Sequence, residues 1–293
     1  MTASVGFVGL GQMGRPMVAA LRSAGYTVAA YDAAPDARAA TPGSVETLTE
    51  AVADLLILML PSSRVVEGVV NDPALVSALS PGALVVDMGS SDPRSTRILG
   101  ARLAHAGVSY VDAPVSGGVT RAEHGSLTIM AGGSPKDVGR ARPVLAAMGD
   151  VTHVGGLGAG HAVKACNNVL AGISLLAAVE VLEVVRAFGL DPAVAFDVIN
   201  SSTGRSWSTE HKIPTFVLQE EYRSGFALSL LVKDIGIARD LAADLGVEHA
   251  LLDRAFELWR HAGRELDVGA DHTAVAEWVA SRRRSIEKSG ADE

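Results

Sequence analysis

The chain has 293 residues, of which 48% are hydrophobic and 20% charged, so it can form one large or two ordinary domains and global disorder is excluded. Its formal net charge of -8 argues against binding a nucleic-acid backbone, which requires clustered positive charge. Cys166 is the only cysteine, so no intrachain disulfide can form, and a reducing compartment such as the cytoplasm is expected. The N-terminus lacks a basic region and no uninterrupted apolar run is long enough for a membrane span, so we expect neither a signal peptide nor a membrane partner.

The first half of the chain alternates short β-branched runs with segments that carry helix-start signals. Strands are predicted at residues 5–8, 27–31, 55–60, 84–87, 110–112, 127–131 and 151–154. Several are apolar throughout, which is typical of parallel strands covered on both faces. Ser44 is expected to cap a helix over residues 45–53, and Pro93 to begin another. The alternation predicts a Rossmann-type, doubly wound α/β sheet over residues 1–160.

Beyond residue 160 the strand pattern stops and helices are predicted. The first covers residues 161–188, with Gly189 as its terminator, and is about 40 Å long at 1.5 Å per residue. Apolar residues occur around most of its circumference, so we expect burial on most sides, a role as an interdomain helix over 161–189, and a candidate subunit contact. Further helices are predicted at 193–200, 228–245, 250–262 and 272–286. Residues 161–293 are therefore predicted to form an all-α domain.

A glycine-rich motif directly follows the first predicted strand. Gly9, Gly11 and Gly14 have the GxGxxG spacing and open a predicted helix, which is the context that makes this motif a dinucleotide site. The first glycine permits a tight turn, the second lets the backbone approach a pyrophosphate, and the third lets helix and strand pack closely. The positive end of the helix then faces the phosphates. The candidate cofactor-binding loop consists of Gly9, Leu10, Gly11, Gln12, Met13 and Gly14.

Polar and turn residues follow three other predicted strands. Asp32 ends the second strand, where a carboxylate can accept hydrogen bonds from the adenosine ribose and would repel a 2′-phosphate, so NAD is favoured over NADP. The alternative is that Asp32 only caps the turn beside Pro35. Leu60, Pro61 and Ser90 follow later strands, at the edge where open α/β sheets bind ligands, but they could equally be ordinary turn residues.

A second motif lies near the start of the long helix. Lys164 and Asn168 are four residues apart, so they lie one above the other on the helix. On spacing alone, such a lysine is more often a snorkelling surface residue than a catalyst. Earlier in the chain, the Ser116 hydroxyl and the backbone of Gly117 and Gly118 can donate hydrogen bonds to a carboxylate.

Two neighbours of this lysine are expected to have no chemical role. We expect Cys166 to be a small buried hydrophobic residue, because it is two positions from Lys164 and so points elsewhere. His161, a lone histidine beside a glycine loop, is expected to be structural. No cluster of His, Cys and carboxylate residues suggests a metal site.

The sequence resembles the β-hydroxyacid dehydrogenase family essentially from end to end. The resemblance rests on residues 6–14, 112–118, 158–168 and 233–234. It implies a helical C-terminal domain like that of 6-phosphogluconate dehydrogenase. It also implies Lys164 as the catalytic residue, Asn168 and residues 116–118 as substrate contacts, Lys233 as a cofactor contact and Ser90 at the nicotinamide end. Gly89 departs from the pattern, since many members have serine before the Ser or Thr.

Together these features predict an NAD-dependent dehydrogenase of a small β-hydroxy acid, similar to 3-hydroxyisobutyrate, that forms the semialdehyde. Lys164 would take the hydroxyl proton as hydride leaves the carbon, or return it in the reverse reaction. Free lysine has a pKa of about 10.4, which burial and a positive nicotinamide would lower. A homodimer or homotetramer is expected.

Two alternatives are kept beside this prediction. One is a semialdehyde or imine reductase on the same fold, although imine reductases commonly lack the lysine. The other is a non-catalytic dinucleotide-binding module. The presence of Lys164 and Asn168 argues against this second alternative. The identity of the hydroxy acid, the direction of the reaction and the role of Arg205 stay open.

Overall fold

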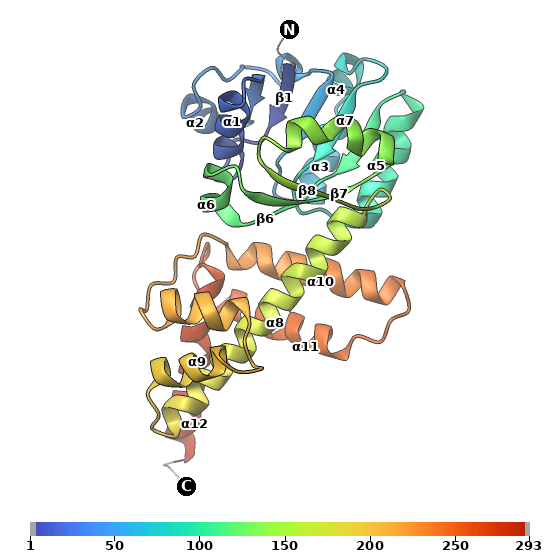
Figure 1. The fold of residues 1–293 in the computed structure, drawn as a ribbon. Helices are drawn as coiled ribbons and strands as arrows, with labels where there is room; N and C mark the ends of the chain where they lie inside the picture. The colour runs from blue at the N-terminus through green and yellow to red at the C-terminus, as the bar shows by residue number, and fades with distance from the viewer. Residues whose placement is uncertain (1–3, 291–293) are drawn as a thin grey trace. The chain divides into compact units, whose positions relative to one another are not determined.

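A computed structural model describes residues 4–290 of the chain (Figure 1). The chain divides into two compact units, Met1–Lys164 and Ala165–Glu293. The division falls inside helix α8 (Ala159–Ala187), a few residues beyond the boundary expected from the sequence. Residues 1–3, part of the stretch from which no signal peptide is expected, lie outside the described residues.

The first unit contains the β-sheet that the sequence predicts, and this sheet is mixed, with antiparallel pairs beside its parallel strands. Its strands lie in the order β2-β1-β3-β4-β5-β7-β6, with β8 paired to β7. Strands β1 to β5 are mutually parallel, β7 is antiparallel to β5, and β8 is parallel to β7. β6 was not predicted because it is only two residues long. The strands are β1 (Ser4–Val8), β2 (Thr27–Tyr31), β3 (Leu55–Leu58), β4 (Leu84–Asp87), β5 (Ser109–Asp112), β6 (Val115–Ser116), β7 (Leu127–Gly132) and β8 (Gly149–Gly155).

Helices cover both faces of this sheet, which confirms the doubly wound architecture (Figure 1). Successive strand residues enter opposite cores: Ile57 joins one apolar cluster, and Leu56 and Leu58 join the other. The first core is shared with α1 (Gly14–Ser23), α6 (Gly118–Glu123) and α7 (Pro135–Leu145). The second is shared with α3 (Ser63–Val70), α4 (Pro73–Ala78) and α5 (Pro93–His105). The remaining short helices of this unit are α2 (Pro35–Ala39) and the 3-10 turn η1 (Thr49–Ala51).

The helix expected after Ser44 is wrong. Ser44 instead forms a parallel bridge with Ala30 of β2, and Val45 donates its amide to the Ala30 carbonyl at 2.8 Å. Pairing with the sheet edge has therefore replaced the local helical hydrogen bonds there, and only η1 remains helical. The expectation for Pro93 is confirmed, since it is the first residue of α5 and the Asp92 carboxylate caps that helix at Arg94 N.

The second unit is helical, also as predicted. Its core is built around Trp259, Leu231 and Ile235, which are almost fully buried. The π-helix η2 contains Pro214 and was not predicted, because its residues show no simple helical period. Following α8, the elements are α9 (Pro192–Asn200), η2 (Ser208–Val217), α10 (Leu228–Asp244), α11 (Ala250–Glu265), the 3-10 turn η3 (His272–Ala274) and α12 (Val275–Gly290).

Helix α8 is less buried than the sequence suggests. Gly189, with φ of 84°, follows its end as expected. Leu175 and Leu182 are buried, but Leu170 and Val184 are 65% and 68% exposed, so the expectation of burial on most sides is wrong for the single chain. By length and composition alone, α8 could cross a membrane. It contains no uninterrupted apolar run long enough for a span, and half of its most apolar 18-residue stretch is buried in the protein. Core helices of soluble proteins share this length and composition.

Candidate active site

The glycine loop between β1 and α1 has the shape that a dinucleotide requires. Gly9 has φ of 105°, and a Cβ there would lie 2.2 Å from the Met59 carbonyl oxygen. A Cβ on Gly14 would lie 1.8 Å from the Gly9 carbonyl oxygen, so the start of α1 packs directly on the loop. At Gly11, in contrast, an added Cβ would meet no atom within 4 Å. The loop is closed where it must pack and open where a pyrophosphate would approach, so its residues fit the cofactor.

Asp32 fastens this loop to the end of β2. Its Oδ2 accepts a hydrogen bond from Leu10 N at 2.7 Å, and its Oδ1 accepts one from Ala34 N at 2.8 Å. The second contact is the turn-capping role considered as an alternative, so Asp32 performs it whether or not it also meets a ribose. The guanidinium of Arg38 donates to the Asp32 carbonyl at 2.9 Å and to Glu46 at 3.3 Å. This nearby positive charge is therefore already paired with groups of the protein.

The carboxylate-binding candidates lie at the junction of β6 and α6. Ser116 is half-buried, whereas Gly117 and Gly118 are exposed. Both glycines have positive φ, 130° and 68°, which ordinary residues rarely adopt. An added Cβ on Gly117 would collide with the Arg121 side chain at 2.4 Å, but one on Gly118 would meet nothing within 4 Å. The turn thus keeps the Gly118 backbone accessible.

A buried carboxylate holds the carboxamide of Asn168. Asn168 Nδ2 donates to Asp234 Oδ2 at 2.6 Å, and Lys233 Nζ donates to Asp234 Oδ1 at 2.7 Å. Asp234 is 1% exposed and Asn168 is 5% exposed. Sequence reasoning gave Asp234 no role of its own, because the pairing joins residues 66 positions apart. Lys164 is half-buried on α8, one helical turn before Asn168.

Two family models together match almost the whole chain. The model for the NAD binding domain of 6-phosphogluconate dehydrogenase matches residues 4–156, and the model described as NAD-binding of NADP-dependent 3-hydroxyisobutyrate dehydrogenase matches residues 158–279. The chain belongs to the β-hydroxyacid dehydrogenase family. It is therefore an oxidoreductase with a nicotinamide dinucleotide-binding domain, as the resemblance implied.

Members of this family cover the chain from end to end. The 2-(hydroxymethyl)glutarate dehydrogenase of Eubacterium barkeri is 36% identical over 294 residues, which span 98% of this chain and 97% of that protein. The mitochondrial 3-hydroxyisobutyrate dehydrogenase of Homo sapiens is 33% identical over 270 residues, which span 87% of this chain and 80% of that protein. The structure of Mycobacterium tuberculosis 3-hydroxyisobutyrate dehydrogenase with L-serine is similar with a TM-score of 0.87 and 33% identity, over 95% of this chain and 99% of that one. These relatives are named for dehydrogenation of small hydroxy acids.

The departure from the β-hydroxyacid dehydrogenase pattern at Gly89 has a steric reason in this chain. A Cβ at this position would lie 2.5 Å from the Leu60 carbonyl oxygen and 3.1 Å from Asp87 Oδ1. Glycine therefore lets the loops that follow β3 and β4 approach each other. Ser90 is half-buried in the second of these loops, and the exposed Pro61 belongs to the first.

Other residues near the motifs give mixed outcomes. Cys166 is exposed, so the expectation of a buried hydrophobic residue is wrong; its face of α8 is not covered by the core. Arg205 is exposed and lies 3.8 Å from Glu210 Oε1, which leaves its role open. Among the described residues, no group of three or more His, Cys, Asp or Glu side chains is arranged to hold a metal.

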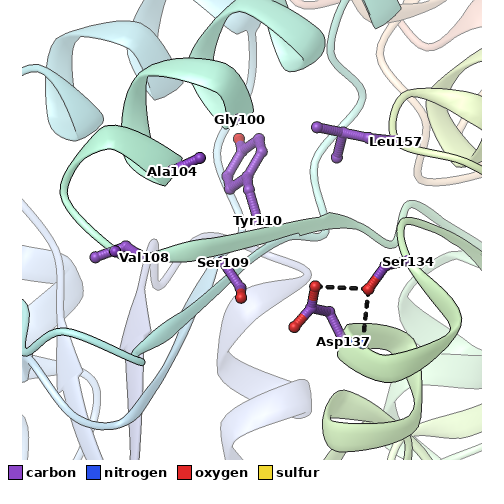
Figure 2. Close-up of a pocket in the computed structure, with 9 residues that line it drawn as sticks. Gly100, Ala104, Val108, Ser109, Tyr110, Ser134, Asp137 and Leu157 are labelled. Atoms are coloured by element: carbon purple, nitrogen blue, oxygen red, sulfur yellow. Dashed lines mark hydrogen bonds between the residues drawn. The ribbon is translucent and has the colours of Figure 1, made fainter.

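A hollow of about 430 Å³ lies outside these motifs, between α5, β5 and the start of α7. Figure 2 shows Tyr110 and Leu157 at its wall and a hydrogen bond from Ser134 Oγ to Asp137 Oδ2, which measures 2.7 Å. The hollow includes Ser109, the first residue of β5, whereas ligands of open α/β sheets bind beyond the carboxyl ends of the strands. No residue of the Gly9–Gly14 loop lines it, so we assign it no part in the reaction.

The second unit contains a separate buried titratable cluster. Lys212 Nζ lies 2.6 Å from His272 Nε2, and His272 Nδ1 lies 3.0 Å from the Phe226 carbonyl. With Nδ1 donating to that carbonyl, Nε2 accepts a hydrogen bond from Lys212. Burial lowers the pKa of Lys212 from 10.5 to about 8, although nearby Asp271 opposes the shift. Burial also lowers the pKa of His272.

Replacing Lys212 by methionine should therefore change how stability depends on pH. Between about pH 8 and pH 10.5 the unfolded wild type binds a proton that the folded form has lost, so its free energy of unfolding rises with pH relative to that of Lys212→Met. Urea unfolding at neutral pH and within this window measures the difference. The exposed Lys136→Met provides the control. If the free energies of unfolding of the wild type and Lys212→Met differ by the same amount across this pH window, the lowered pKa of Lys212 is contradicted.

Proposed function

We propose that the protein oxidises the hydroxyl of a small β-hydroxy acid to the semialdehyde with NAD, and that Lys164 is the proton carrier. The observation that supports this most directly is the helix α8 motif. Lys164 and Asn168 lie on one helix a turn apart, and the Asn168 carboxamide is fixed by the buried Asp234. A snorkelling surface lysine would need no such anchored carboxamide beside it.

The chemistry follows from the groups present. In the oxidation the substrate hydroxyl loses its proton to the Lys164 amine, and in the reduction the ammonium returns it. When bound, the nicotinamide supplies the hydride acceptor or donor. Ser116 and the backbone of Gly118 donate hydrogen bonds to the substrate carboxylate, and Asn168 orients the reacting hydroxyl.

The choice of a β-hydroxy acid follows the names of the relatives, and a substrate similar to 3-hydroxyisobutyrate is proposed first. A semialdehyde reductase would use the same residues in the opposite direction. A panel of hydroxy acids and semialdehydes, followed by NADH absorbance, tests both. Turnover of imines in preference to hydroxy acids, or no turnover with any of them, would instead support an imine reductase or a non-catalytic dinucleotide-binding module.

Asp32 should make the enzyme prefer NAD to NADP. Its carboxylate would bind the ribose hydroxyls and repel a 2′-phosphate, whereas Asp32→Ala removes both effects and should lower kcat/KM with NAD by about 10- to 100-fold, the value of one charge-assisted hydrogen bond. Steady-state kinetics with both cofactors measures the preference. The exposed Asp36→Ala, on the neighbouring helix α2, is the control. A wild-type preference for NADP, which the description of the second matching family model leaves open, would refute the role of Asp32.

We also propose that the second unit assembles with another copy of the chain. Four apolar residues are each more than half exposed: Val184 near the end of α8, Phe188 directly after that helix, and Val194 and Val198 on α9. Several large apolar side chains exposed on successive helices are typical of subunit interfaces. Phe188→Glu should therefore convert a dimer or tetramer into smaller species in multi-angle light scattering. Ile98→Glu, which alters another largely exposed apolar residue, on α5, should leave the mass unchanged. A wild-type mass of 30.2 kDa at micromolar concentration would contradict the proposal.

A further inference from the structure

A buried carboxylate from the sheet caps the helix that carries Lys164. Asp112 is the last residue of β5 and is fully buried. Its Oδ1 accepts a hydrogen bond from Gly158 N at 2.7 Å, and its Oδ2 accepts one from His161 N at 2.8 Å. Amides at the start of a helix have no partner within the helix, so this carboxylate satisfies two of them and favours the positive helix end. Asp112 thus fixes the beginning of α8 to the end of β5, one turn before Lys164.

The backbone around this carboxylate leaves it no room to move. A Cβ on Gly132 would lie 2.5 Å from Asp112 Oδ1, and one on Gly160 would lie 2.9 Å from Asp112 Oδ2. The same Gly160 Cβ would also lie 2.1 Å from the Met130 carbonyl oxygen. Both positions accept only glycine, so the first turn of α8 packs against β7 and the carboxylate at backbone contact distance.

His161 connects the same turn of α8 to α5. Its side chain is completely buried, and Nδ1 lies 2.8 Å from Thr96 Oγ1. Thr96 Oγ1 is also 3.1 Å from the Asp92 carbonyl, to which it donates, so its oxygen accepts a hydrogen bond from His161 Nδ1. The other ring nitrogen, Nε2, has no hydrogen-bond partner among the described residues and lies 3.7 Å from Asp87 Oδ2.

Asp87 in turn shapes the loop that carries Ser90. Its Oδ1 accepts a hydrogen bond from Gly89 N at 2.9 Å, and its Oδ2 accepts one from Ser91 Oγ at 2.8 Å. Tyr110 donates to the same Oδ2 at 3.3 Å, and its pKa is raised by burial and by Asp87, so the hydroxyl remains a donor. Ser90 therefore lies between Gly89 and Ser91, which both donate hydrogen bonds to Asp87.

We propose that Asp112 and His161 are positioning residues, which hold Lys164 in a fixed place relative to the Ser90 loop. This inference rests on the proposed function, in which Lys164 carries the proton and Ser90 lies at the nicotinamide end. Asp112 sets where α8 begins, and His161 ties its first turn to Thr96 and faces Asp87. Lys164 follows His161 by three residues, so a displacement of this turn displaces the amine. A misplacement of about 1 Å can cost roughly 100-fold in rate.

The test compares His161→Leu with His161→Asn. Leucine fills a similar volume but removes both ring nitrogens, whereas asparagine retains an N–H donor that can reach Thr96. His161→Leu should lower kcat of the folded enzyme by about 10- to 100-fold and shift the pH at which kcat is half-maximal, because Lys164 is misplaced. The Kd for NAD, measured by calorimetry, should not change. His161→Asn should recover part of the lost kcat, and Asp112→Asn, which turns one acceptor into a donor, should resemble His161→Leu.

Asp191→Asn is the matched control for Asp112→Asn. Asp191 caps α9 by accepting from Ala193 N at 2.8 Å and Val194 N at 3.2 Å, but it has no link to the first turn of α8. Its loss should lower the melting temperature without changing kcat or the pH profile. Circular dichroism measures the folded fraction of each variant. If Asp112→Asn does not fold, kcat and the pH profile of His161→Leu, His161→Asn and Thr96→Val still test the positioning role. Thr96→Val removes the hydrogen bond to His161 Nδ1 from the other side and should therefore resemble His161→Leu.

Two failures can be told apart in this design. If folded His161→Leu turns over at the wild-type kcat with the wild-type pH profile, these residues are merely structural and the inference is overturned. If Lys164→Ala, measured beside it, retains activity on the same substrate, the proposed function itself is wrong. A loss of activity in Lys164→Ala together with normal activity in His161→Leu overturns only the positioning role.

Discussion

Lys164→Ala should reduce kcat by about two to four orders of magnitude, the usual contribution of a general acid–base group. The substrate hydroxyl would then have to release its proton to water instead of to a positioned amine. Lys164→Arg should not restore the rate, because a guanidinium stays protonated and cannot accept the proton. In the wild type, alcohol oxidation should become faster as pH rises, since only the neutral amine can act as the base.

The affinity for NAD separates this effect from a damaged fold. The dinucleotide is expected to be held mainly by the Gly9–Gly14 loop and Asp32, so its Kd in Lys164→Ala should match the wild type in calorimetry. Lys136→Ala, at an exposed position of α7, is the control for loss of a lysine in the same unit. Asn168→Ala should slow turnover less severely, because the carboxamide orients the substrate and transfers no proton. Near-normal kcat in Lys164→Ala would make the lysine structural.

Local signals were sufficient to predict most of the fold. Short β-branched and apolar runs predicted β1 to β5, and the glycine spacing predicted a loop whose three glycines fit their expected steric roles. The one helix that is wrong, after Ser44, lies where pairing with Ala30 of β2 competes with helical hydrogen bonding. The prediction for α8 was right in extent but wrong in burial, because an apolar residue pattern does not show whether the second side is covered by the same chain.

The site was less predictable because its decisive contacts join distant parts of the sequence. Asp112 meets Gly158 across 46 positions, and Asn168 meets Asp234 across 66. The motifs contain these residues, but neither spacing nor periodicity shows that one carboxylate will cap a helix and another will hold a carboxamide. His161 was expected to be structural, and only its burial beside Thr96 and Asp87 shows what it connects.

Removing Asp234 should damage both stability and catalysis. Its buried carboxylate accepts hydrogen bonds from Asn168 and Lys233, so Asp234→Ala leaves an ammonium and an amide without this acceptor. Losing one partner of a buried pair costs about 3–5 kcal/mol, and the Lys233 side chain is 24% exposed, so the lower end is expected for the free energy of unfolding. Urea unfolding measures this change. kcat/KM for the hydroxy acid should also fall, because the Asn168 carboxamide is no longer fixed.

A matched control and a milder variant distinguish the two effects. Asp240 pairs with the preceding Arg239 on the same helix α10, in the same arrangement as Asp234 with Lys233, but its side chain is 44% exposed. Asp240→Ala should therefore cost less than about 1 kcal/mol and leave kcat/KM unchanged. Asp234→Asn keeps a carbonyl acceptor for Asn168 but loses the charge that faces Lys233, so it should retain substrate binding better than Asp234→Ala while weakening cofactor binding. If Asp234→Asn and Asp234→Ala lower substrate kcat/KM equally, the hydrogen bond to Asn168 is not what positions the carboxamide, and the charge of Asp234 alone accounts for its effect.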